Sequence, residues 1–340
     1  MKKLFNIEYK DIISIENLLE AWQEFLKGKK KKIDVLEFQK NLMSNIISLH
    51  TDLINKSYKH GDYKAFNIND PKPRSIHKAS VRDRILHRAI YRKLYPFFDR
   101  TFISDSYSCR LGKGTLMSIN RFKRFVYKVS KNNTKQCWIL KGDIRKFFAS
   151  VNHDIILKIT AEYINDKDIV CLIDKIIISF YATRKNIGLP LGNLTSQLLV
   201  NIFMNKFDQW VKHRMKIKYY IRYTDDFVIF SQDKDYLWEL VPKIADFLEE
   251  ELSLTLHPNK IFIKTIASGM DFLGWVNFPD HKILRINTKR RALKALSESG
   301  NINKLSSYRG LLIHGNQYVL KEKFFEKIKE IEAKEKGGLI

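Results

Sequence analysis

Two adjacent carboxylates between two strand-like segments constrain the fold of this chain more than any other feature. Asp225 and Asp226 close the sequence Tyr-Thr-Asp-Asp, which lies between the aromatic and β-branched runs 218–222 and 227–231. Such runs favour strands, so the pattern predicts a hairpin whose tight turn presents both carboxylates. Adjacent carboxylates repel each other unless a cation stabilises them, and their hard oxygens suit Mg²⁺. The alternative is a solvated hairpin tip, because Asp is a common turn residue.

A third carboxylate ends a strand-like segment upstream. Segment 136–143 is largely apolar and predicts a buried strand that ends on Asp143, and Asn152 is a good N-cap for a following helix. If this strand neighbours the hairpin, Asp143 meets the carboxylate pair, and two metal ions about 3.5–4 Å apart would be held there. The alternative is a polar residue that simply terminates a strand.

The charge of the chain points to nucleic acid. Lys and Arg total 61 against 37 acidic residues, a net charge of +24, and the excess is concentrated between Lys72 and Lys146. Such a field attracts a phosphate backbone. No stretch approaches the roughly 18 apolar residues of a membrane span, and the start lacks the long apolar region of a signal peptide. Three separated cysteines form neither a disulfide framework nor a zinc pattern. We therefore expect a cytoplasmic protein without membrane contact.

Several motifs occur in the order of a known family. Asp143-x-x-x-x-Phe148 followed by Tyr223-x-Asp225-Asp226 resembles the palm of reverse transcriptases. The resemblance runs from about Lys72 to Asn316. Three further segments resemble the loop and helix behind the template and incoming nucleotide, the lysine segment and the primer-grip hairpin: 188–203, 254–260 and 272–275.

The resemblance implies an α+β chain with the right-hand polymerase fold, which comprises fingers, a ferredoxin-like palm and a short helical thumb. Residues 1–60 would be an N-terminal helical extension, 60–283 fingers and palm, and 284–340 the thumb. In the palm we expect strand, helices, strand, strand, helix, strand, with helices near 194–213 and 235–252. We expect a minimal polymerase, without an endonuclease or ribonuclease H domain.

The catalytic residues implied are Asp143, Asp225, Asp226 and Lys260. The three carboxylates and the backbone carbonyl of Ile144 would bind two Mg²⁺ ions, with Mn²⁺ as an alternative. Lys260 would protonate the departing pyrophosphate as a general acid. An exposed structural lysine is the alternative for Lys260.

The resemblance also implies a nucleotide-binding site, which comprises more residues than the catalytic set. Phe148 would be the steric gate that excludes a 2′-hydroxyl, or else a core residue, whereas Phe147 is expected in the core. The fingers residues Lys72 and Arg74 suit triphosphate capture. Two further arginines are candidates for triphosphate or template contact, and the motif loop and helix complete the set: Arg84, Arg110, Leu191, Gly192, Ser196 and Gln197.

One departure indicates a subgroup. Most reverse transcriptases have Gln-Gly-x-x-x-Ser-Pro in the central motif, but here Leu191 replaces the Gln and Gln197 the Pro. The variant is similar to reverse transcriptases of diversity-generating retroelements, in which it accompanies error-prone copying of template adenines. A looser fit beside the templating pair is physically consistent with that.

The resemblance also implies the partners. These are template RNA, a primer and its cDNA, dNTPs, and a small helical accessory protein that forms a ring oligomer. The primer grip would comprise Phe272, Leu273, Gly274 and Trp275. Three alternatives remain: a retron- or group II intron-like enzyme of ordinary fidelity, a non-polymerising nucleic-acid-binding subunit on the same fold, and an RNA-synthesising polymerase. The aromatic Phe148 argues against the last.

Overall fold

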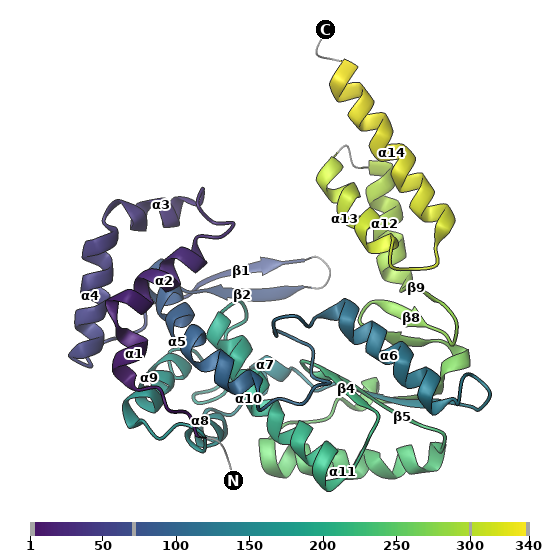
Figure 1. The fold of residues 1–340 in the computed structure, drawn as a ribbon, viewed down its shortest axis with the longest axis horizontal. Helices are drawn as coiled ribbons and strands as arrows, with labels where there is room; N and C mark the ends of the chain where they lie inside the picture. The colour runs from purple at the N-terminus through teal and green to yellow at the C-terminus, as the bar shows by residue number, and fades with distance from the viewer. Residues whose placement is uncertain (1–3, 70–72, 299–300, 338–340) are drawn as a thin grey trace. The chain divides into compact units, whose positions relative to one another are not determined.

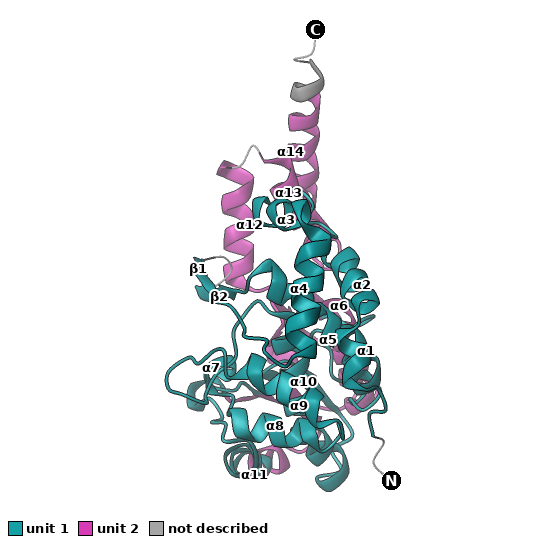
Figure 2. Ribbon diagram, turned by 90° about the vertical axis from the view of Figure 1, so that its left-hand side faces the viewer, with its two compact units in different colours: residues 1–114, 142–227, 240–260 teal, residues 115–141, 228–239, 261–340 magenta. Residues whose placement is uncertain are grey.

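Helices and small sheets alternate along the chain (Figure 1). The computed structural model describes residues 4–69, 73–298 and 301–337. It divides into two units, shown in separate colours in Figure 2. Unit 1 comprises residues 1–114, 142–227 and 240–260, and unit 2 comprises 115–141, 228–239 and 261–340. The predicted α+β class is confirmed.

The N-terminal part of unit 1 is helical, as predicted. Ser14 caps helix α2 by accepting a hydrogen bond from the Asn17 N–H, and one helix face is buried at intervals of three and four residues. That face comprises Leu18, Ala21, Trp22 and Phe25. The four helices are α1 (Tyr9–Ile13), α2 (Ile15–Phe25), α3 (Ile33–Lys40) and α4 (Leu42–Ile54).

A two-stranded hairpin and a long helix follow in unit 1. Strand β1 (Lys64–Ile68) pairs antiparallel with β2 (Arg74–Lys78). Helix α5 (Val81–Asp99) then begins at Ser80, whose hydroxyl accepts a hydrogen bond from the Asp83 N–H. The hairpin therefore leads directly into a helix whose start is fixed by its own cap.

The predicted order of palm elements is confirmed. A four-stranded sheet has the order β4-β5-β3-β6, with four helices between β3 and β4 and one between β5 and β6. This is the split βαβ arrangement of ferredoxin-like folds. The strands are β3 (Trp138–Gly142), β4 (Tyr220–Tyr223), β5 (Asp226–Ser231) and β6 (Phe262–Thr265). The helices are α7 (Phe147–Ser150), α8 (His153–Ala161), α9 (Lys167–Ile177), α10 (Leu194–Gln209) and α11 (Lys234–Leu252).

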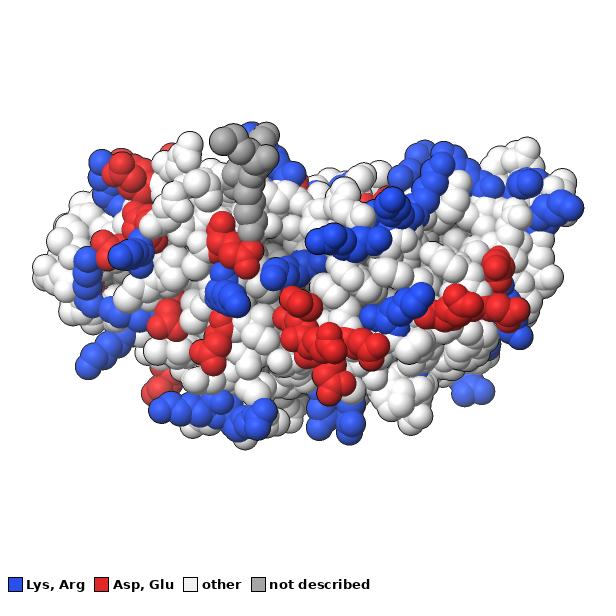
Figure 3. Space-filling view, turned by 90° about the horizontal axis from the view of Figure 1, so that it is seen from below, with Lys and Arg blue, Asp and Glu red and all other residues white. Residues whose placement is uncertain are grey.

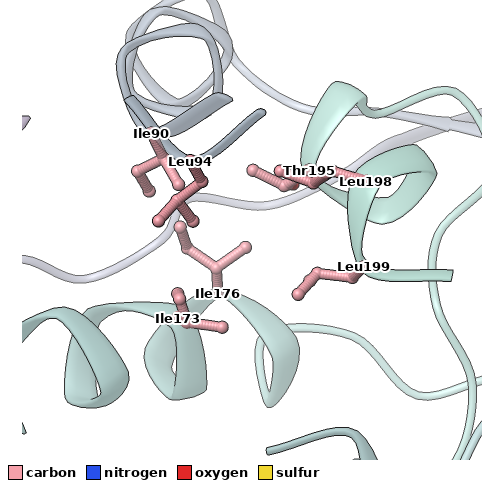
Figure 4. Close-up of a pocket in the computed structure, with 7 residues that line it drawn as sticks. All are labelled: Ile90, Leu94, Ile173, Ile176, Thr195, Leu198 and Leu199. Atoms are coloured by element: carbon pink, nitrogen blue, oxygen red, sulfur yellow. The ribbon is translucent and has the colours of Figure 1, made fainter. Parts of the chain in front are cut away.

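Helix α10 is held in unit 1 by apolar packing against α5 and α9. Side chains from the three helices point toward one another around a cavity of about 10 Å³ (Figure 4). The lining residues are Ile90, Leu94, Ile173, Ile176, Thr195, Leu198 and Leu199. A void this small leaves the helix close-packed, which fixes the residues of its first turn. The helix ends in a π-helical turn at Trp210–Arg214.

Unit 2 contains a second small sheet and the C-terminal helices. Strands β7 (Met270–Phe272), β8 (Trp275–Asn277) and β9 (Lys282–Leu284) form an antiparallel meander. Two 3₁₀ turns, Pro258–Lys260 in unit 1 and Ile266–Ser268 in unit 2, flank β6. The helices that lie wholly in unit 2 are α6 (Thr115–Val129), α12 (Ile286–Glu298), α13 (Ile302–Leu312) and α14 (Tyr318–Gly337). The helical character predicted for the C-terminal segment is confirmed.

None of the helices among the described residues combines the length and apolar character that crossing a membrane requires.

Candidate active site

The carboxylate pair lies on the tight turn between β4 and β5, as predicted. Thr224 and Asp225 form the turn, and Asp226 is the first residue of β5. Thr224 has φ of 57°, which is unusual for a β-branched residue. Two contacts hold it there. Arg222 Nη1 donates to the Thr224 carbonyl at 3.0 Å, and the Thr224 hydroxyl bonds the Ser108 hydroxyl at 2.5 Å. Hydrogen bonds to the carbonyl and to the hydroxyl of Thr224 therefore hold the turn in this conformation.

Arg222 itself belongs to a buried polar network. Its guanidinium donates to both carboxylate oxygens of Asp208, and the Tyr220 hydroxyl donates to the same carboxylate at 2.7 Å. Ser106 and Asn201 accept further bonds at 3.1 and 3.4 Å. Sequence reasoning missed these residues. An arginine in an apolar strand, two residues before the turn, was the available signal.

Asp143 directly follows strand β3. The preceding Gly142 lies so close to the Phe227 ring that a Cβ atom on it would come within 2.2 Å of the ring. With the Phe227 ring in this position, residue 142 can only be a glycine. Because Asp143 and Asp226 adjoin these two positions in sequence, this contact draws the β3 end and the hairpin turn together within unit 1.

A backbone bridge joins the Asp143 segment to the lysine segment. The His257 N–H donates to the Asp143 carbonyl at 2.8 Å, and the Arg145 N–H donates to the Thr255 carbonyl at 2.9 Å. Neither bond uses the carbonyl of Ile144, the predicted backbone ligand. The bridge places Lys260 beside Asp143, and Lys260 Nζ lies 3.1 and 3.2 Å from the two oxygens of the Asp143 carboxylate.

The electrostatics of the turn resemble those of a cation site. Burial, together with the negative charges of Asp226 and Asp143, raises the pKa of Asp225 to about 6. Carboxylate oxygens are the ligands that Mg²⁺ prefers, so the donor set fits this ion. Within the described ranges, however, no group of three or more His, Cys, Asp or Glu side chains is arranged so as to hold a metal ion. Shared binding of metal by the three carboxylates therefore stays a prediction.

The two phenylalanines after Asp143 face different environments. Phe147 is buried, with 3% of its surface exposed, whereas Phe148 is only partly buried. Their rings meet edge to face at 5.5 Å. The Phe148 carbonyl accepts the Leu189 N–H at 2.7 Å, which fixes the backbone of this residue against the loop before α10.

That loop also meets the β1–β2 hairpin. The His77 N–H donates to the Leu191 carbonyl at 3.0 Å. Gly192 has φ of +110°, and a Cβ atom there would lie 2.9 Å from Ile76. The structure thus joins Leu191 and Gly192 to the strand that begins with the exposed Arg74.

The first turn of α10 carries the other motif residues. Ser196 is buried and Gln197 partly buried. Asn193, the N-cap residue, is 2% exposed, yet neither atom of its side-chain amide finds a hydrogen-bond partner among the residues that the structure describes. Such a group costs free energy when it is left unpaired. Asn193 was not among the predicted site residues. Only its burial, which the sequence does not reveal, singles it out.

Two predicted fingers arginines are engaged elsewhere. Arg84 pairs with Asp34 at 2.5 Å and lies over the Phe25 ring. Arg110 donates to Asp99 Oδ1 at 2.7 Å and to three backbone carbonyls. The structure brings neither into contact with the carboxylate turn. Lys72 lies outside the described residues.

The predicted primer-grip segment forms a hairpin in unit 2. Phe272 ends β7 and Trp275 begins β8, and the turn residues Leu273 and Gly274 have φ of 50° and 87°. Two positive φ values in a two-residue loop are typical of a type I′ turn.

On the face drawn in Figure 3, basic and acidic side chains are interspersed. On this face the net positive charge of the chain is therefore not gathered into one uninterrupted basic patch.

Residues 62–276 match the family model described as "Reverse transcriptase (RNA-dependent DNA polymerase)". This range includes every predicted catalytic residue.

Several known proteins and a solved structure are also similar to this chain. Protein YkfC of Escherichia coli (strain K12) is 24% identical over 264 residues, which cover 66% of this chain and 67% of YkfC. The putative COX1/OXI3 intron 1 and intron 2 proteins of Saccharomyces cerevisiae are 28% and 21% identical. The matches cover 43% and 59% of this chain but only 18% and 30% of those proteins. A structure of apo telomerase from Candida tropicalis, truncated from its C-terminal domain, aligns with a TM-score of 0.49 and 14% identity over 70% of this chain and 59% of that one.

Proposed function

Because the chain belongs to the reverse transcriptase family, we propose that it extends a DNA primer on an RNA template by nucleotidyl transfer. The observation that supports the proposal is the close approach of Gly142 and Phe227, the residues next in sequence to Asp143 and Asp226. In this reaction the primer 3′-hydroxyl oxygen attacks the α-phosphorus of a dNTP. The bond between the α-phosphorus and pyrophosphate breaks, and the hydroxyl proton passes to solvent water.

The carboxylates of Asp143, Asp225 and Asp226 and the carbonyl of Ile144 would hold two Mg²⁺ ions, with Mn²⁺ as an alternative. When bound, the ions lower the pKa of the primer hydroxyl and neutralise the triphosphate. The raised pKa of Asp225 supports this assignment, because burial and the negative charges of Asp226 and Asp143 both disfavour its carboxylate form unless a cation is bound.

Other residues would bind and select the nucleotide. Lys260 Nζ donates a hydrogen bond to Asp143, and Lys260 would act as the general acid toward pyrophosphate. Arg74 would hold the triphosphate, with Lys72, since Arg84 and Arg110 are committed to Asp34 and Asp99. The partly buried ring of Phe148 would exclude a 2′-hydroxyl.

The domain assignment follows the same proposal. Residues 1–60 would extend the fingers, 60–283 would form fingers and palm, and 284–340 the thumb. In this arrangement the Phe272–Trp275 hairpin would grip the primer, and template RNA, cDNA and dNTPs would be the partners.

Primer extension tests the proposal. The parent should incorporate dNTPs, and rNTPs poorly, on an RNA template with Mg²⁺. Asp225→Asn should lower the rate by several powers of ten while RNA affinity persists, because an amide cannot share a dication. Asp154→Asn, an exposed change on α8, is the matched control. No extension by the folded parent would favour a non-polymerising subunit, and a preference for rNTPs would favour an RNA-synthesising polymerase.

We further propose that the enzyme serves a diversity-generating retroelement. Leu191 and Gln197 support this, because they replace the Gln and Pro of other reverse transcriptases. The contact of Leu191 with His77 places the altered loop against the β1–β2 hairpin. A small helical accessory protein that forms a ring would be the expected partner. The similar yeast intron proteins favour the alternative, an intron-like enzyme of ordinary fidelity.

Sequencing cDNA made from a defined RNA distinguishes the two. A diversity-generating enzyme should misincorporate mainly opposite template adenine, and Leu191→Gln, alone or with Gln197→Pro, should lower that error without abolishing synthesis. About 1.4 kcal/mol of differential transition-state stabilisation changes the error tenfold. If the error at adenines is uniformly low, with any accessory protein supplied, the enzyme is instead an intron- or retron-like reverse transcriptase.

A further inference from the structure

Helix α6 in unit 2 has two contrasting faces. One face is buried, with Ile119, Phe122 and Val126 almost completely inaccessible. The other carries polar and aromatic residues at intervals of three, four and seven, which places them along one side of the helix. These residues are Asn120, Lys123, Arg124 and Tyr127.

This face of α6 forms one wall of a cleft, and the segment after β8 forms the other. Two adjoining hollows, of about 460 and 220 Å³, share Asn120, Lys123 and Asp280 in their linings. Phe278, His281 and Lys282 complete the opposite wall. The larger hollow lies in the range of about 300–1,000 Å³ that is usual for ligand sites. All of these residues belong to unit 2, and none was assigned a role above.

The charges in the cleft are not balanced. Lys123, Arg124 and Lys282 have no carboxylate partner in the part of the chain that the structure describes. The acidic residue in the lining, Asp280, is paired with His281 Nδ1 at 2.8 Å. Burial and the charge of Lys123 lower the pKa of Lys282. Two lysines that repel each other in a partly enclosed site are stabilised by a shared anion.

Aromatic rings line the same cleft. The Tyr127 side chain is 53% exposed. The Phe278 ring stacks on the His281 ring with centroids 4.5 Å apart and planes 8° apart. Lys282 Nζ lies over the Trp275 ring, 5.1 Å from its centroid. Aromatic rings beside cations that lack a carboxylate partner are the pattern of surfaces that hold single-stranded nucleic acid, with phosphates on the cations and unstacked bases on the rings.

We propose that this cleft binds a single-stranded segment of RNA, with Lys123 and Lys282 on its phosphates and Tyr127 stacked on a base. The proposal deepens, and rests on, the proposed copying of an RNA template. It adds an RNA-binding site built from α6 and the β8–β9 segment, which shares no residue with the proposed catalytic set.

Equilibrium binding tests the cleft independently of polymerisation. The full chain is titrated by fluorescence anisotropy with a labelled single-stranded RNA of about 12 nucleotides, without dNTPs or divalent ions. Lys123→Ala and Lys282→Ala should each weaken binding about three- to tenfold and lower the salt slope by about 0.7. Lys264→Ala is the matched control, since it removes an exposed lysine of unit 2 that does not line the cleft. It should change affinity less than about twofold.

A second variant tests the strandedness of the ligand. Tyr127→Ala should weaken single-stranded RNA binding at least about fivefold and leave binding of duplex RNA unchanged. Photocrosslinking of RNA that contains 4-thiouridine should map to α6 or the 278–281 segment.

Three results would overturn the proposal. In the first, Lys123→Ala and Lys282→Ala bind RNA with the same affinity as Lys264→Ala. In the second, Tyr127→Ala weakens the binding of duplex and single-stranded RNA equally. In the third, the crosslinks are confined to other segments of the chain. The first of these would also arise if the cleft held an acidic protein. If the chain binds RNA through the cleft but does not extend primers, the proposed polymerase function is wrong, whereas the proposed RNA-binding site is supported.

Discussion

Arg222 donates to both oxygens of the Asp208 carboxylate, at 2.8 Å from Nε and 2.7 Å from Nη2, and both side chains are shut off from solvent. The same guanidinium holds the Thr224 carbonyl at 3.0 Å. Such a buried two-point pair fixes the orientation of the arginine side chain, because the planar guanidinium donors match the two carboxylate oxygens. The ion pair thus supports the turn that carries Asp225.

Removing one charge of this pair should be costly. Asp208→Asn is expected to lower the free energy of unfolding by about 3–5 kcal/mol, because Arg222 would remain charged and buried without its partner. Urea unfolding measures the effect. Arg222→Met combined with Asp208→Leu should cost less than the sum of the two single changes. Strictly additive losses would show that the two residues do not act as a pair.

The neighbouring phenylalanines should separate into a selective residue and a structural one. Phe148→Ala should admit rNTPs in primer extension, because removal of the ring opens space for a 2′-hydroxyl. Phe147→Ala should instead lower the free energy of unfolding by about 3–5 kcal/mol, since its side chain is buried. If both variants reject rNTPs as the parent does, Phe148 is not the gate.

Gly142 should tolerate no side chain. Gly142→Ala would force the Phe227 ring away from β3, and we expect a loss of about 1–3 kcal/mol in unfolding free energy together with reduced primer extension. Gly310→Ala is the matched control, because Gly310 lies in α13 and an added Cβ there would have no atom of another described residue within 4 Å outside the helix itself. That change should be neutral or stabilising by up to about 1 kcal/mol. Equal effects of the two changes on unfolding would contradict the close approach.

His87 should make stability depend on pH. Burial and the adjacent His60 lower the pKa of His87 to about 3, although Asp83 acts in the opposite direction. In the unfolded chain its pKa is about 6.5. Between these values the unfolded state binds a proton that the folded state does not, so the free energy of unfolding should fall as pH decreases from about 6.5. The slope contributed is at most about 1.4 kcal/mol per pH unit.

His87→Gln should remove that slope. Urea unfolding of parent and variant between about pH 5 and 7 measures the difference. Parallel curves for the two proteins would mean that His87 titrates normally in the folded state.

The elements nearest the site could be predicted because their signals are local. Strand-forming runs on both sides of Thr224 and Asp225 define the hairpin, and the Asn152 side chain caps α8 through bonds to residues two and three positions ahead. The order of strands and helices then indicated the ferredoxin-like palm, and the family match confirms the right-hand polymerase fold. These interactions depend on residues close in sequence, so the sequence alone determined them.

Tertiary structure decided which polar groups are committed to folding and which remain for a ligand. Arg84 and Arg74 look alike in sequence, but Arg84 is held by Asp34, whereas Arg74 is exposed on β2. Arg222 resembles any strand residue until Asp208 is seen beside it. The α6 cleft exists only because the β8–β9 segment lies opposite Lys123. Pairing and burial depend on which distant segments meet, and no local pattern in the sequence encodes that.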